Sequence, residues 1–161
     1  MAIPVLEKIV SGGQTGVDRA ALDAAMRHGV PCGGWCPRGR LAEDGRIPEI
    51  YPLAETGSAE YPERTRRNVE DSDGTLILNL GPLDGGTLFT QVVARECGKP
   101  CLVLDLEGDW DPDVVVEWLN RHRIGTLNVA GPRESKRPGT YTLAGAAMDR
   151  ILAAVFRKQP G

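Results

Sequence analysis

The sequence predicts an α/β protein of Rossmann-like, three-layer architecture, with a mostly parallel sheet of about five strands flanked by helices. Three observations support this fold class. Short β-branched or apolar runs alternate along the chain with apolar residues at helical spacing. Several of the runs are apolar throughout, as expected for strands buried on both faces of a sheet. No composition break, repeat or linker interrupts the sequence, so residues 1–161 are expected to form a single Rossmann-like ligand-binding domain.

The first strand and the first helix flank a glycine-rich turn. The apolar run at 5–12 leads into "SGGQTGVDRAA", and alanines at helical spacing then predict a helix over 17–27 that packs closely on the sheet. Gly29 suits the C-cap of this helix. The short run "CGGWC" at 32–36 predicts a second strand. Residues 37–58 show no sustained period, and a loop of that length in a compact domain is usually functional or mobile.

The rest of the chain repeats the strand–turn–helix pattern. A charged helix comes first, with a proline suited to its first turn. Three further apolar runs each precede a turn and a helix, and acidic residues begin one of these helices, where the helix dipole favours them. Right-handed crossovers leave few topologies, and we expect the strand order 3-2-1-4-5. The expected strands lie at 74–81, 100–106 and 126–131, and the expected helices at 61–71, 88–99, 111–123 and 140–158.

Composition excludes several classes of partner. The net charge of −3 offers no general attraction to nucleic acid, and an aromatic content of 5% provides few surfaces for base stacking. No apolar stretch approaches the length of a membrane span, and "MAIPVLEK" lacks the pattern of a secretory signal. We therefore expect a cytoplasmic protein that binds neither nucleic acid nor membranes.

The four cysteines form two matched pairs, "CGGWC" and "CGKPC". Each pair has three residues between its cysteines, whereas zinc knuckles and thioredoxin motifs usually have two. Small apolar side chains also suit the ends of strands, so packing is favoured over a metal site or a functional disulfide. No metal ligand is assigned. The roles of these residues stay open: Cys32, Cys36, Cys97 and Cys101.

Ligands of doubly wound sheets bind beyond the carboxyl ends of the strands, which selects the loops "GGQTG", "CPRGR", "GPLDGGT" and "AGPRES". Two of them place glycines before a helix start, where backbone N–H groups favour anions. Neither has the spacing of the dinucleotide fingerprint or the P-loop, and a turn without a ligand is the alternative. Together with arginines they predict a two-sided anion cradle. The predicted ligand-binding residues are Gly12, Gly13, Gln14, Thr15, Arg19, Arg38, Gly85, Gly86, Thr87, Arg133 and Lys136.

Carboxylates near these loops are candidates for chemistry. Asp18 lies in the first turn of the first helix and Glu134 in the last loop, and these two are the candidate catalytic residues. Glu43 and Asp44 lie in the long loop, where their geometry cannot be read. Trp35 suits either a flat ligand ring or core packing. We favour a role for Asp18 in orienting a ligand over a role in catalysis.

Several segments resemble, in order and spacing, the putative molybdenum carrier family: "SGGQTGVDRAALDAA", "GGWCPRGRLAEDGRIP", "YPL", "RTRRNVEDSDGTLIL", "GGT" and "LNVAGPRES". The resemblance spans nearly the whole chain. That family belongs to a Rossmann-like superfamily of nucleotide-binding domains that includes the Lonely Guy phosphoribohydrolases, long mislabelled lysine decarboxylases. The resemblance implies a binding protein whose ligand is molybdenum cofactor, molybdate or a related anion, with no catalytic cofactor evident.

The phosphoribohydrolase relatives use a P-G-G-x-G-T-x-x-E motif whose last residue supplies a catalytic carboxylate. Matching its Gly-Thr to Gly86–Thr87 puts Thr90 in the place of that glutamate. This departure argues against phosphoribohydrolase activity, unless Asp18, Asp84 or Glu134 supplies the acid.

Three functions are therefore weighed. The favoured one is a binding or carrier protein for an anionic phosphorylated small molecule, either a pterin phosphate such as molybdenum cofactor or a nucleotide. The alternative is a hydrolase or transferase that acts on a nucleotide or nucleotide-sugar, and the third is a nucleotide-sensing module. Self-association into a homo-oligomer is also expected, because Leu152, Val155 and Phe156 give the final helix more apolar positions than one sheet face needs.

Overall fold

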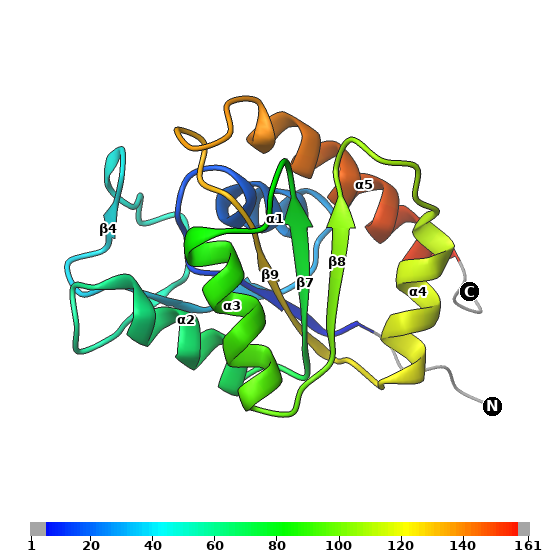
Figure 1. The fold of residues 1–161 in the computed structure, drawn as a ribbon, viewed down its shortest axis with the longest axis horizontal. Helices are drawn as coiled ribbons and strands as arrows, with labels where there is room; N and C mark the ends of the chain where they lie inside the picture. Colours follow the sequence, from blue (N-terminus) through cyan, green and yellow to red (C-terminus); the bar gives the residue numbers. More distant parts are fainter. Residues whose placement is uncertain (1–5, 158–161) are drawn as a thin grey trace.

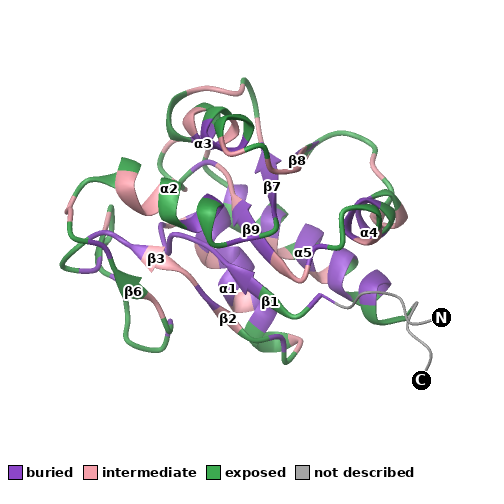
Figure 2. Cartoon of the chain, turned by 90° about the horizontal axis from the view of Figure 1, so that it is seen from below, coloured by how far each residue is buried: buried purple, intermediate pink, exposed green. Residues whose placement is uncertain are grey.

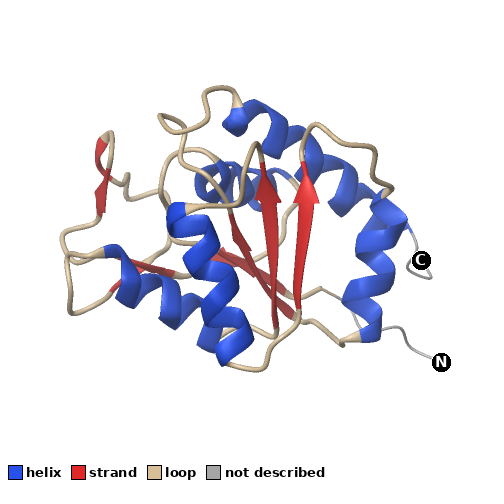
Figure 3. Ribbon diagram, viewed as in Figure 1, coloured by secondary structure: helices blue, strands red, loops and turns tan. Residues whose placement is uncertain are grey.

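A five-stranded parallel sheet with helices on both faces forms the centre of the molecule (Figures 1 and 3). The structure, a computed structural model, describes residues 6–157. It confirms the α/β, Rossmann-like fold class. The expected extensions of the first strand to residue 5 and of the last helix to residue 158 lie outside the described residues. The strands of the sheet are β1 (Lys8–Val10), β2 (Cys32–Gly33), β7 (Gly74–Asn79), β8 (Cys101–Asp105) and β9 (Thr126–Ala130).

The order of the strands across the sheet is β2-β1-β9-β7-β8, so the expected order 3-2-1-4-5 is wrong. The last strand along the chain, β9, pairs with β1 on one side and with β7 on the other. If the count is started at β7, the same sheet has the order 2-1-3-4-5 of flavodoxin-like folds. A permuted chain has the same local apolar pattern as an unpermuted one, which is why the pattern could not predict the order.

The five helices cover the two faces of this sheet. On one face α1 packs against α5 and α5 against α4, while α2 packs against α3 on the other (Figure 1). None of the described helices is long and apolar enough to cross a membrane. The helices are α1 (Val17–Arg27), α2 (Tyr61–Glu70), α3 (Gly85–Glu96), α4 (Pro112–Arg121) and α5 (Thr140–Arg157).

The strands differ in how far they are buried (Figure 2). Every residue of β7 is buried, as expected for a central strand between two helical layers. By contrast, β8 is at the edge of the sheet, and Val103 in its middle is 38% exposed despite the continuous apolar run. In α5, Leu152 and Val155 are buried in the core of the chain itself and Phe156 is exposed.

The segment "CGGWC" does not form one strand, contrary to expectation. Gly34 lies between β2 and β3 (Trp35–Cys36) with a φ of 128°, and a Cβ there would lie 2.2 Å from the carbonyl oxygen of Ser11. This turn directs β3 away from the main sheet to pair with β6 (Ala54–Glu55). The segment therefore contributes to two sheets.

The long segment 37–58 is ordered around one buried arginine. It contains the antiparallel hairpin of β4 (Leu41–Ala42) and β5 (Gly45–Arg46). Arg40 has a φ of 54°, and its side chain is buried. Its guanidinium donates hydrogen bonds of 2.8–3.2 Å to the carbonyl oxygens of Ile47, Pro48, Tyr51 and Leu53. Since the guanidinium satisfies four carbonyl groups, the segment needs little regular structure of its own.

The cysteines are unpaired and contribute to packing. Cys36 is buried in a cluster with Leu22, Ile47 and Tyr51. Cys97 and Cys101 are partly buried against the small core between α2 and α3. Burial raises the pKa of the Cys101 thiol above its ordinary value.

Candidate functional site

A cavity of about 330 Å³ opens at the carboxyl ends of β7 and β9, beside α2 and the loop after β1. The connection that follows β1 runs to β2 on one side of the sheet, and the connection that follows β7 runs to β8 on the other. Such a reversal is the usual ligand-binding position of doubly wound sheets. The predicted site residues that line the cavity are Gly12, Gln14, Asp18, Gly85, Gly86, Thr87, Arg133 and Lys136.

The glycine-rich loop after β7 presents unbonded amides to this cavity. Gly85 has a φ of 54° and begins α3, so that the helix starts earlier than residue 88, where it was expected. The backbone N–H groups of Gly85, Gly86 and Thr87 have no hydrogen-bond acceptor among the described residues. Asp84 is the N-cap residue, but its side chain accepts no hydrogen bond from them. The first turn of α3 therefore has the free donors and dipole that favour an anion.

The loop after β1, in contrast, satisfies several of its own amides with groups of the protein. The backbone N–H of Gln14 donates to Oδ2 of Asp18 at 3.3 Å, and that of Thr15 donates to Oε1 of Gln14 at 3.0 Å. The N–H of Val17 donates to the carbonyl oxygen of Pro132 at 3.2 Å. These three donors are not available to a ligand, although Gly12 and Gln14 line the cavity.

Arg64 on α2 was not predicted as a site residue, yet it lines the cavity. It forms an ion pair with Asp18 (Nη1–Oδ2 3.1 Å), and the two side chains are 13% and 9% exposed. Gly12 makes room for it, since a Cβ there would lie 1.7 Å from Nη1. The Nε of Arg64 is buried without a hydrogen-bond partner in the described structure. Burial raises the pKa of Asp18, against the opposing effect of Arg64.

Two cations from the loop after β9 also line the cavity. Nζ of Lys136 is 2.7 Å from Oδ1 of Asp84, and a Cβ at Gly85 would lie 2.5 Å from that Nζ. Nε of Arg133 lies 3.2 Å from Oε1 of Glu43. The ion pair with Lys136 lowers the pKa of Asp84.

Other predicted ligand-binding residues have structural partners and do not line the cavity. Arg19 forms an ion pair with Asp44 (Nη1–Oδ2 2.6 Å) and also donates to the carbonyl oxygen of Gly13. Arg38 donates to the carbonyl oxygen of Gly57 at 3.3 Å, in the loop that leads to α2. Thr15 donates its hydroxyl proton to Glu43.

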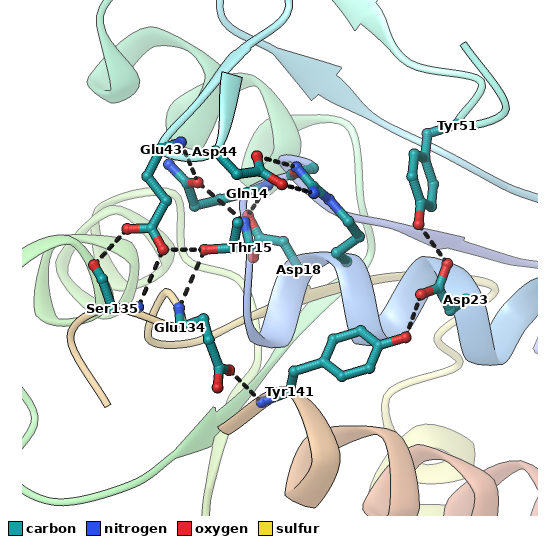
Figure 4. A network of polar contacts seen from close by, with 12 residues as sticks. Gln14, Thr15, Asp18, Asp23, Glu43, Asp44, Tyr51, Glu134, Ser135 and Tyr141 are labelled. Atoms are coloured by element: carbon teal, nitrogen blue, oxygen red, sulfur yellow. Dashed lines mark hydrogen bonds and ion pairs between the residues drawn. The ribbon is translucent and has the colours of Figure 1, made fainter. Parts of the chain in front are cut away.

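Glu43, at the tip of the β4–β5 hairpin, joins two of the loops around the cavity (Figure 4). Its carboxylate accepts hydrogen bonds from the hydroxyls of Thr15 and Ser135 and from the backbone N–H of Ser135. Burial would raise the pKa of Glu43, but the bonds from Ser135 and Thr15 outweigh it and hold the pKa below its usual value. The hairpin thereby fixes the loop after β1 to the loop after β9.

The remaining candidates for chemistry are also placed. The carboxylate of Glu134 accepts the backbone N–H groups of Gly139 (2.7 Å) and Tyr141 (2.8 Å), at the start of α5. Thr90 lines the cavity and donates its hydroxyl to the carbonyl oxygen of Gly86. Trp35 bonds Asp71 through its indole N–H and is not among the lining residues. Glu134 therefore acts as a helix cap here.

Comparison with known proteins agrees with the topology. Residues 9–152 match the family described as "Circularly permutated YpsA SLOG family". A crystal structure from Syntrophus aciditrophicus SB, named "Putative molybdenum carrier protein", is similar with 46% identity and a TM-score of 0.86. The alignment covers 92% of this chain and 96% of that one. No curated protein matches the chain. The matched residues and the permuted strand order show that this chain belongs to the circularly permutated YpsA SLOG family.

Proposed function

We propose that this protein binds and carries an anionic, phosphorylated small molecule at the first turn of α3. The observation that carries the proposal is the set of open amides at Gly85, Gly86 and Thr87, directed to a cavity that Lys136 and Arg64 also line. Three N–H donors at a helix N-terminus match the oxygens of a phosphate or another tetrahedral oxyanion. The two cations supply charge-assisted hydrogen bonds.

Molybdenum cofactor or molybdate is the cargo that we favour, because a relative with 46% identity carries the name of a molybdenum carrier. The donors around the cavity suit such a cargo through its oxygens. The described residues that line it include arginine, lysine, threonine and asparagine but no cysteine or histidine. The protein would therefore bind the phosphate or the oxyanion by hydrogen bonds, and soft protein ligands would not contact the metal.

Among the described lining residues, Asp18 is the one carboxylate that supports the alternative of a nucleotide-processing hydrolase. Its Oδ2 already accepts from Arg64 and from the amide of Gln14, which orients it as a structural partner. Thr90 supplies a hydroxyl where the related phosphoribohydrolases have their catalytic acid. We therefore assign a binding function, and turnover of a nucleoside monophosphate to free base, lost in Asp18→Asn, would contradict it.

A ligand panel tests the proposal. Native mass spectrometry and isothermal titration calorimetry with phosphate, molybdate, nucleoside monophosphates and molybdenum cofactor should identify at least one anion that binds with one-to-one stoichiometry. Gly86→Ala should abolish binding of that anion. A Cβ at Gly86 would meet no protein atom within 4 Å and would project into the cavity that Gly86 lines, where it would take the space of the anion. The matched control is Gly145→Ala in α5, whose nearest neighbour is Arg27 at 3.9 Å and which should leave the affinity unchanged.

A second variant pair tests the role of charge. Lys136→Met should weaken binding roughly tenfold, which corresponds to the loss of one charge-assisted hydrogen bond. Arg38→Met removes a cation of the same charge outside the cavity and should change the affinity little. The proposal fails if no anion of the panel binds, or if the two variants have equal effects.

Self-association and a cytoplasmic location stay predictions. Because Leu152 and Val155 contribute to the core of one chain, the exposed Phe156 is what remains of the argument for an oligomer. Sedimentation velocity of the purified protein measures the mass directly.

A further inference from the structure

Each cation that lines the cavity already has a carboxylate partner. Much of the positive charge at the site is therefore already compensated, in contrast to what its arginines and lysine alone would indicate. A dianion that enters it competes with these carboxylates for the cations. The three pairs are Arg64–Asp18, Arg133–Glu43 and Lys136–Asp84, with shortest N–O distances of 3.1, 3.2 and 2.7 Å.

The pair between Arg64 and Asp18 is difficult to open. The side chains of Arg64 and Asp18 are 13% and 9% exposed, and separating a buried pair leaves a charge without compensation. Glu43 is fixed by its hydrogen bonds from Thr15 and Ser135 as well as by Arg133. Arg133 is 49% exposed, so it can leave Glu43 without breaking those hydrogen bonds.

The pair between Lys136 and Asp84 can also open at small cost, and its ammonium group lies beside the open amides. Its side chains are 30% and 49% exposed, and ion pairs this exposed contribute little to stability. Asp84 also has a second cation, since Nη2 of Arg137 lies 3.4 Å from its Oδ2. Arg137 is itself fixed through Nε, which donates to the carbonyl oxygen of Leu80 at 3.0 Å. Asp84 therefore keeps a partner when Lys136 leaves it.

Lys136 needs only a small movement to reach an anion. A Cβ on Gly85 would lie 2.5 Å from its Nζ, so the ammonium group lies beside the first of the open amides. Asp84 immediately precedes those amides and carries a competing negative charge. The same lysine can serve the carboxylate in the empty site and the ligand in the filled one.

We propose that Lys136 exchanges partners when the anion binds, leaving Asp84 to Arg137 and turning to the ligand. Asp84 thereby acts as a positioning residue that limits affinity and favours release, as a carrier requires. Arg137 retains the displaced carboxylate and does not contact the ligand. This inference rests on the proposed function, that is, on anion binding at the first turn of α3.

The test is a double-mutant cycle with phosphate and molybdate as probes, measured by titration calorimetry and stopped-flow dissociation. Asp84→Asn should tighten binding about fivefold and slow dissociation, because Lys136 no longer has a competing partner. Asp84→Glu should restore the wild-type values. Arg137→Met should weaken binding severalfold in the wild-type background, since Asp84 then depends on Lys136 alone, and should have no effect in the Asp84→Asn background.

Asp105→Asn is the control for a general change of charge, because Asp105 lies at the end of the neighbouring strand β8, outside the cavity lining. Asp105→Asn should leave both the affinity and the dissociation rate of the probe anions unchanged. The partner exchange is wrong if Asp84→Asn weakens binding or has no effect, or if Arg137→Met acts equally in both backgrounds. If wild type and Asp84→Asn both fail to bind either probe while a pterin or nucleotide binds, the proposed function survives and the exchange fails. If nothing binds, both fail.

Discussion

Two glycine-rich loops that look alike in the sequence differ in the structure in what their backbone amides do. In the loop after β1, amides of Gln14, Thr15 and Val17 all donate to groups of the protein. In the loop after β7, the amides of Gly85 and Gly86 have no acceptor among the described residues. Glycine therefore marks where the chain can turn tightly, and the neighbouring side chains determine whether the amides of the turn are free.

The difference comes from the acceptors nearby. Asp18 and Gln14 both direct side-chain oxygens to the amides of the first loop. The second loop also has an aspartate, Asp84, at the N-cap position where it would ordinarily accept these protons. Lys136 and Arg137 bind that carboxylate instead, so the first turn of α3 stays open.

The largest expected effect concerns Asp18, which connects the first loop to α2. Asp18→Ala removes the acceptor of Gln14 and leaves Arg64 buried without its partner, so unfolding should become easier by about 3–5 kcal/mol. Asp44→Ala breaks the pair with Arg19, but the carboxylate is half exposed and Arg19 keeps its hydrogen bonds to the carbonyl oxygen of Gly13, so the loss should be at most about 1 kcal/mol. Urea denaturation measures both. Equal losses in the two variants would contradict the structural role given to the first loop.

The next largest effect is expected from glycine-to-alanine substitutions, which should lower the stability of the protein in the first loop but not in the second. Gly16 has a φ of 78°, and a Cβ there would lie 2.4 Å from the carbonyl oxygen of Pro132, so Gly16→Ala should destabilise the protein by about 2 kcal/mol or more. Gly86→Ala should change stability by less than about 0.5 kcal/mol, since nothing lies near its Cβ. Thermal unfolding of both variants checks this. A destabilised Gly86→Ala would indicate that the second loop is structural too.

The smallest effect concerns Glu43, which joins the first loop to the loop after β9. Its lowered pKa means that its ionised form stabilises the fold above the ordinary value of 4.5, and this stability is lost as the pH falls through the folded-state pKa. Wild type should therefore exceed Glu43→Gln in stability by about 1 kcal/mol at neutral pH. The difference should shrink below pH 4.5, as urea denaturation at several pH values will determine. A difference that is independent of pH would show that the charge of Glu43 is irrelevant.

Local sequence was sufficient to predict most of the helices and strands. The apolar run of β7 and the alanine stripe of α1 indicated elements whose buried faces the structure confirms. The loops at the carboxyl ends of β7 and β9 were predicted as the ligand-binding edge, and the cavity opens between them. Such patterns are reliable because the burial of a helix or strand depends mainly on its own period.

Three arginines show what the local sequence could not predict, namely the partner of a long charged side chain. Arg38, Arg40 and Arg64 all lie in charged stretches that resemble solvated surface. The structure places Arg38 in an outer loop, buries Arg40 under four carbonyl groups, and directs Arg64 to Asp18 in the cavity. The partner of a long side chain depends on which distant segments pack beside it, and no local period records that.

The sequence by itself therefore determined the fold class, the alternation of strands and helices, and the edge of the sheet where the cavity opens. The tertiary structure decided the strand order, because the place of β9 between β1 and β7 depends on pairing between segments far apart in the chain. It also decided that the first turn of α3 has open amides. That outcome depends on Lys136 and Arg137, about fifty residues from Asp84 in the chain, which bind its carboxylate only in the folded protein.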